Sequence, residues 1–172
     1  MGAIGGYYAA KFFCSDYNLK VLVDRERFER YNKDPRVINN KVYEFDYVMP
    51  DYTGYIADMV IIATKSDGLL SAIDNIEHFV GDNTIIMSFL NGVTSENQIK
   101  EKYGEKVLYS YLLGHTFFRK GENIFHDGNA RIFFGSPNVN DSRVDNVKIV
   151  FEKIGVGYQV SDDILTSLWK KF

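Results

Sequence analysis

The sequence has one cysteine and no long hydrophobic run, and each scarcity excludes a class of protein. Cys14, the single thiol in 172 residues, has no partner for an internal disulfide, which excludes a disulfide-stabilised secreted domain. The longest apolar runs, such as residues 59–63, are far shorter than the ~20 residues that span a bilayer. The first residues also lack the charged and then apolar order of a signal peptide. We therefore expect a cytoplasmic protein with no membrane partner.

An excess of positive charge is lacking as well. The formal net charge is −3 and the sequence pI is near 5.6, which argues against a nucleic-acid partner. Aromatic residues are abundant, with 12 Tyr and 13 Phe, but they are spread along the whole chain. We interpret them as core and surface side chains rather than as a platform on which bases stack.

Residues that bind metals or act as nucleophiles form no recognisable pattern. His78, His115 and His126 have no metal-ligand spacing with one another or with Cys14, so we expect no metal site. Cys14 follows two phenylalanines on an expected helix, where a thiol is usually buried and inert.

The order of apolar and polar residues predicts strands alternating with helices, and hence a mainly parallel sheet with helices on both faces. The continuous apolar residues 57–64 predict a strand buried on both faces. Ser161 is the expected N-cap of the last helix. The expected helices are residues 3–14, 67–79, 95–103, 141–154 and 161–172, with 26–34 a short helix or loop. The expected strands are residues 19–23, 57–64, 84–90, 107–113, 115–118, 130–135 and 156–160, with one or two lesser strands within 37–48.

Glycines open the first expected helix. Gly2 and Gly5 have the spacing of the last two glycines of a G-x-G-x-x-G dinucleotide-binding motif, whose first glycine and preceding strand are not in the chain. In that motif one glycine lets the backbone approach a pyrophosphate, another lets the helix pack closely, and the free N–H groups bind the anion. We therefore expect Gly2, Ala3, Ile4 and Gly5 to hold a cofactor pyrophosphate.

Three expected strands end in polar residues. Asp24 and Arg25 follow the first of these strands, at about the 20-residue distance at which an acidic residue meets the adenosine ribose. Lys65 and Asn91 follow the next two strands. Because ligands of an open α/β sheet bind at the carboxyl ends of its strands, these residues favour nucleotide binding. Lys65 and Asn91 also have simpler interpretations. Lys65 can be a solvated residue at a strand end, and Asn91 can be part of an Asn-Gly turn.

Four segments carry a resemblance to a known family. GAIGGYYAAKF, ADMVIIATKSDG, SFLNGVTSENQI and SLWKKF resemble successive motifs of the ketopantoate reductases, and the resemblance covers nearly all 172 residues. These enzymes use NADPH to reduce 2-dehydropantoate to pantoate, on the route to pantothenate and coenzyme A. The resemblance implies a Rossmann-like NAD(P)-binding domain over residues 1–160 that lacks its first strand. It also implies that residues 161–172 begin the helix leading to a C-terminal helical domain that is absent here.

The resemblance also implies roles for single residues. Gly2 and Gly5 match the glycines at the pyrophosphate, Lys65 a residue beside the adenosine phosphate, and Asn91 a residue near the nicotinamide ribose. Lys171, two residues after Trp169, matches the catalytic lysine, a general acid that donates a proton to the carbonyl oxygen as hydride reaches carbon.

Two departures from the family pattern leave alternatives open. The family usually has an arginine for the 2′-phosphate of NADP where this chain has Asp24, with Arg25 one place later. We expect NADP, with NAD as the alternative, because aspartate suits a free ribose diol. The helical domain that completes the substrate site is absent, so we expect this chain to be inactive alone. A related dehydrogenase of another 2-keto or 2-hydroxy acid and a non-catalytic nucleotide-binding remnant are the rival functions. An apolar face left without the first strand and second domain predicts a homo-oligomer.

Overall fold

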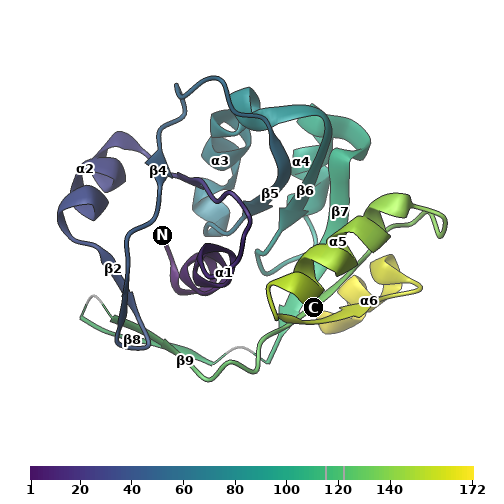
Figure 1. Ribbon diagram of the computed structural model, residues 1–172. Coiled ribbons are helices and arrows are strands. Elements are labelled where there is room, and N and C mark those ends of the chain that lie inside the picture. The colour runs from purple at the N-terminus through teal and green to yellow at the C-terminus, as the bar shows by residue number, and fades with distance from the viewer. Residues whose placement is uncertain (115, 122) are drawn as a thin grey trace.

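Helices cover both faces of a central sheet in the computed structural model, which describes residues 1–114, 116–121 and 123–172 (Figure 1). The helices are α1 Ala3–Phe13, α2 Arg25–Lys33, α3 Leu69–Asn75, α4 Ser95–Tyr103, α5 Ser142–Lys153 and α6 Ile164–Lys171. The strands are β1 Val21–Leu22, β2 Arg36–Ile38, β3 Lys41–Tyr43, β4 Tyr47–Val48, β5 Ala57–Ile62, β6 Val80–Ser88, β7 Val107–Leu113, β8 Phe117–Lys120, β9 Asn123–His126, β10 Arg131–Gly135 and β11 Gly157–Val160. The prediction of a Rossmann-like α/β fold is confirmed.

The central sheet has five strands in the order β11-β10-β7-β6-β5. β5, β6 and β7 are parallel, whereas β10 runs antiparallel to β7 and parallel to β11. Side chains at alternating positions of the strands contribute to two hydrophobic cores, one on each face of the sheet. Tyr7 and Tyr8 of α1 and Phe151 of α5 pack with Met87 on one face, and α3 and α4 pack with Ile86 on the other. α6 packs against Tyr109 and Tyr111 on the second face.

Two short strands form a separate sheet beside β5. β1 pairs in parallel with β4, and neither β1 nor β5 has a partner on its second edge among the described residues. In the Rossmann strand order the first strand lies between strands at these two positions. Leu22 of β1 and Val60 of β5 pack against the same core, so the two sheets continue each other across this gap. The expectation that residues 57–64 are buried on both faces is wrong: within β5 only Ile62 is fully buried, because solvent reaches the strand from its unpaired edge.

A third sheet, of order β3-β2-β9-β8, lies beyond α1 (Figure 1). The expected one or two strands within 37–48 are three short strands, β2 beginning at Arg36, divided between two sheets. β9 was not predicted, because its four residues form a strand only by pairing with β2 and β8. β2 is remote in sequence, and β8 has no regular pattern of apolar and polar residues. His115, expected in a strand, lies outside the described residues.

Aspartates cap three of the helices. Asp24, Asp141 and Asp163 each accept a hydrogen bond from a backbone N–H in the first turn of α2, α5 and α6. The expected cap Ser161 is therefore wrong: its hydroxyl pairs with Ser167 Oγ at 2.9 Å, while Asp163 accepts from Thr166 N at 3.1 Å.

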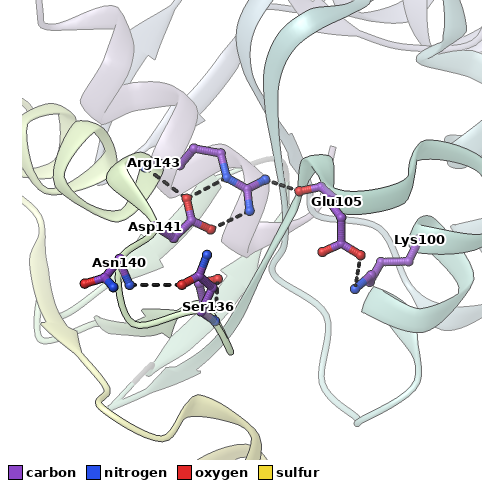
Figure 2. A network of polar contacts seen from close by, with 7 residues as sticks. Lys100, Glu105, Ser136, Asn140, Asp141 and Arg143 are labelled. Carbon is purple, nitrogen blue, oxygen red and sulfur yellow. Dashed lines mark hydrogen bonds and ion pairs between the residues drawn. The ribbon is translucent and has the colours of Figure 1, made fainter.

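A polar network fixes the start of α5 to the connection between α4 and β7 (Figure 2). Asp141 pairs with Arg143 at 2.5 Å, and this guanidinium also donates to the carbonyl oxygen of Glu105. The Glu105 carboxylate in turn pairs with Lys100 at 2.8 Å. The hydrogen bond from Arg143 lowers the pKa of Asp141 to about 2, so this carboxylate stays ionised far into acid.

Two further features of the chain bear on its surface. Among the described residues, no helix is long and apolar enough to cross a membrane. Cys14 is the C-cap of α1 and is exposed, so the expectation of a buried thiol is wrong. α1 ends at Phe13, and the chain after it turns away from the core. The two phenylalanines before Cys14 gave no indication in the sequence that the thiol would be exposed.

Candidate functional site

The N-terminus of α1 is open and uncapped by any side chain. Gly2 is its N-cap, and the first turn contains no acidic residue. A Cβ added at Gly2 would meet no atom within 4 Å, whereas one at Gly5 would lie 3.4 Å from Cβ of Ala63, just beyond β5. The first glycine thus faces open space, and the second lets the helix approach the carboxyl end of a strand. Free N–H groups and the helix dipole make this end of α1 suited to an anion.

Asp24 and Arg25 begin α2, next to the end of β1. The Asp24 carboxylate accepts from Arg27 N at 2.7 Å and forms an ion pair with the Arg27 guanidinium. Arg25 is exposed on the first turn. The Asp24 carboxylate therefore serves as the N-cap of α2, a role that was not predicted from the sequence.

Three arginines that were not predicted surround the start of α1. Burial and the charges of Arg27, Arg36 and Arg30 lower the pKa of the Met1 amino group to about 5. Arg36 is only 2% exposed, and its guanidinium lies 4.8 Å from the ring centroid of Tyr31. The only indication of these arginines in the sequence was the abundance of charge in residues 24–36. That abundance does not show which arginine becomes buried.

Asn91 and Lys171 meet although 80 positions separate them. Nζ of Lys171, in the last turn of α6, donates to Oδ1 of Asn91 at 3.2 Å. The same ammonium lies 5.5 Å from the ring centroid of Tyr111 on β7, and burial lowers the pKa of Lys171. A lysine with a lowered pKa can donate a proton more readily than one in water. Lys65 is exposed just after β5 and has no described contact with this pair.

A buried polar network supports the loop that carries Asn91. Glu96, only 1% exposed, accepts from Ser95 Oγ at 2.8 Å and from Ser110 N at 3.5 Å. Ser88 at the end of β6 donates to Ser95 at 2.9 Å and accepts at its carbonyl from Ser110 Oγ at 2.7 Å. Burial raises the pKa of Glu96. This network was not predicted, because a charged residue in an amphipathic helix is ordinarily expected in solvent.

Within the described residues, no group of three or more His, Cys, Asp or Glu side chains is placed to hold a metal ion. The site therefore consists of an open helix N-terminus, arginines beside it, and a paired lysine and asparagine at the carboxyl end of the sheet.

Comparisons with known proteins give this geometry a family. The family model described as "Ketopantoate reductase PanE/ApbA" matches residues 1–138. The "Uncharacterized oxidoreductase YkpB" of Bacillus subtilis (strain 168) is 25% identical over 99% of this chain and 58% of its own length. The 2-dehydropantoate 2-reductase of Aquifex aeolicus (strain VF5) is 25% identical over 99% of this chain and 56% of its own length.

Solved structures agree on the fold. The 2-dehydropantoate 2-reductase of Geobacter metallireducens GS-15 aligns with a TM-score of 0.83 at 21% identity, over 99% of this chain and 59% of its own. A D-mandelate dehydrogenase in a ternary structure with NADH and anilino(oxo)acetate aligns with a TM-score of 0.80 at 20% identity, over 99% and 57%. This chain thus spans somewhat more than half the length of the proteins it matches. Since the family model covers most of the chain, the protein belongs to the ketopantoate reductase family of oxidoreductases.

Proposed function

We propose that this chain is the NADPH-binding domain of an enzyme that reduces a 2-keto acid, 2-dehydropantoate, to its 2-hydroxy acid in the synthesis of pantothenate. The observation that carries the proposal is the contact of Lys171 with Asn91, which places a proton donor at the carboxyl ends of β6 and β7. Ligands of open α/β sheets bind at this edge. We expect the reaction to take place in the cytoplasm.

The residues present fit a dinucleotide. Gly2, Ala3, Ile4 and Gly5 offer an uncapped helix N-terminus with free space above its first glycine, which suits a pyrophosphate. Asn91 and Lys65 follow two strands whose carboxyl ends face the same edge of the sheet, where they would meet the nicotinamide ribose and the adenosine phosphate.

The arginines at the start of α1 favour NADPH over NADH. Asp24 alone would repel a 2′-phosphate, but its charge is paired with Arg27. Arg30 and Arg36 add positive charge in the same region, and Arg25 is exposed beside it. The exposed guanidinium groups of Arg25 and Arg30 can bind phosphate in bidentate geometry, and the buried Arg36 contributes only its charge, so together they offset the aspartate.

Lys171 would act as the general acid. The cofactor, when bound, supplies the hydride that reduces the carbonyl carbon. Lys171 holds the proton that the carbonyl oxygen needs, and Asn91 orients the ammonium through its amide oxygen. Burial, which lowers the pKa of Lys171, makes this proton easier to give at neutral pH. Another 2-keto acid remains the alternative substrate, because the substrate-selecting residues of the family lie outside this chain.

Calorimetric titration of this chain with NADPH and with NADH tests the proposal. We expect NADPH to bind more tightly, and we expect Gly2→Val to abolish binding of both. Gly2 has φ −81° and no atom near its Cβ position, so the valine should leave the fold intact while filling the space proposed for the pyrophosphate. Circular dichroism checks the fold of the variant.

Two other results of this titration would change the proposal. Tighter binding of NADH would make Asp24 the determinant and reverse the choice of cofactor. Binding of neither nucleotide at millimolar concentration would contradict nucleotide binding by this chain and favour a non-catalytic remnant.

A further inference from the structure

A cavity lies at the end of α1 that is remote from the glycines. It has a volume of about 420 Å³ and is half open to solvent. Its walls come from the last two turns of α1, the hairpin of β2 and β3, one residue of β9 and the end of α5. Because the helix rises ~1.5 Å per residue, the residues of α1 that line the cavity, from Tyr7 to Cys14, lie ~8 to ~18 Å along the axis from Gly2. It is therefore separate from the proposed cofactor site.

Positive charge dominates the walls of this cavity. Lys11, Lys41 and Lys153 line it, and no aspartate or glutamate does, although the chain as a whole carries a net charge of −3. Lys11 donates to the carbonyl oxygen of Gly155 at 3.2 Å, and Lys41 lies 3.7 Å from Sγ of Cys14. Neither contact neutralises an ammonium.

The third lysine is only weakly paired. Nζ of Lys153 lies 3.8 Å from a carboxylate oxygen of Asp16, whose side chain is 93% exposed and is not part of the cavity wall. Such exposed pairs contribute little and are screened by salt. All three ammonium groups are thus available to an incoming anion.

The rest of the wall combines apolar and aromatic side chains with the polar side chains of Ser15, Asn39 and His126. Tyr7, Ile38 and Ile154 are buried beneath it, and the ring of Tyr43 lies 5.1 Å from Nζ of Lys41. A bare inorganic ion would leave this surface unused. An organic molecule of modest size, with an anionic group at one end, would satisfy both the lysines and the apolar wall.

We propose that this cavity is a second ligand site, which binds a small organic anion: a phosphate ester or carboxylate on an aromatic or aliphatic body. The anionic group lies among Lys11, Lys41 and Lys153, and the body packs on Tyr7, Ile38 and Tyr43. Cys14, on the rim, lies within reach of a bound ligand.

Cys14 makes the site measurable, because it is the single thiol of the chain and is exposed. The rate of its reaction is measured with two disulfides, the dianionic dithiobis(nitrobenzoate) and the neutral dithiodipyridine. In each, the Cys14 thiolate attacks one sulfur, a mixed disulfide forms, and the other half leaves as a thiolate or thione. Phenyl phosphate is the probe ligand, and we expect it to slow both reactions with the same saturable dependence on its concentration.

Lysine variants separate binding from general electrostatics. Two unit charges ~4 Å apart interact by about 1 kcal/mol even in bulk water, so Lys41→Met and Lys153→Met should each weaken protection by phenyl phosphate at least about fivefold. Lys148→Met, a matched control on α5 that removes the same charge outside this cavity, should leave protection unchanged. Calorimetry of Cys14→Ser with phenyl phosphate should give the same affinity without the thiol.

Three outcomes overturn the inference. They are the absence of protection, equal weakening by Lys148→Met, and loss of protection in Gly2→Val, which would place the phosphate at the start of α1 instead. The last variant also keeps the two proposals apart. Gly2→Val should abolish NADPH binding and leave this site intact, whereas Lys41→Met should weaken binding of phenyl phosphate and leave NADPH binding unchanged.

Discussion

Glu96 is the one acidic residue that is buried among the described residues, and its network supports the loop that carries Asn91. The hydrogen bonds that its carboxylate accepts from the Ser95 hydroxyl and from the backbone N–H groups of Ser110 and Glu96 compensate only part of the cost of burial, and burial raises its pKa. The folded state therefore binds a proton at Glu96 more tightly than the unfolded state does. The contribution of this residue to stability is complete below pH 4.5 and is lost as the pH rises through the folded pKa.

Glu96→Gln should remove this pH dependence. Measured by urea unfolding, the variant should gain stability relative to the native chain as the pH rises from about 4.5 to 7. Glu101→Gln, on the exposed side of the same helix, is the control and should show no such trend. A constant difference between Glu96→Gln and the native chain across this range would mean that Glu96 is ionised in the folded state at little cost.

Single residues also show which roles the sequence can reveal. Asn91 and Lys171 were predicted through the family motifs, and the structure brings them together. Arg36 was missed, because an arginine in a polar stretch becomes buried only when distant segments cover it. Asp24 was read as a ribose ligand, yet aspartate is equally common at helix N-caps, and the pattern in sequence does not separate the two roles.

At the scale of elements, the local order of apolar and polar residues was enough to predict most helices and strands. The boundaries of α4 and β7 were predicted to the residue, because an amphipathic repeat and a buried apolar run each identify themselves within a few positions. Residues 37–48 were harder. Their strands pair with β9 and β1, so their number and sheet depend on contacts that no local window contains.

The cap of α6 is a prediction at this scale, and it bears on the site because α6 carries Lys171. Asp163→Ala should remove the bond to Thr166 N and lower the melting temperature by a few degrees. Ser161→Ala, which changes the residue first expected to cap the helix, should have a clearly smaller effect, since it loses only a hydroxyl contact with Ser167. Scanning calorimetry of both variants decides between the two caps, and a larger effect of Ser161→Ala would restore the first expectation.

Two of the strand edges that lack a partner among the described residues lie opposite each other across one gap. β1 and β5 face the same gap, and their backbone groups are unpaired there among the described residues. Unpaired strand edges beside apolar surface pair readily with another chain. Ile56, immediately before β5, adds an apolar side chain that is 60% exposed. These features support the expectation that this chain forms homo-oligomers.

Light scattering over a range of concentrations tests that expectation on the chain itself. We expect the mean mass to rise with concentration, and Ile56→Lys to shift the equilibrium towards the monomer by placing a charge on the exposed apolar surface at the start of β5. Ile149→Lys is the matched control, because Ile149 is also 60% exposed but lies on α5, away from both edges. If both variants dissociate the oligomer equally, association is driven by general surface hydrophobicity. A monodisperse monomer at the highest concentration would mean that the two edges protect each other across the gap, with α1 and the shared core of Leu22 and Val60 holding them too close for a second chain to enter.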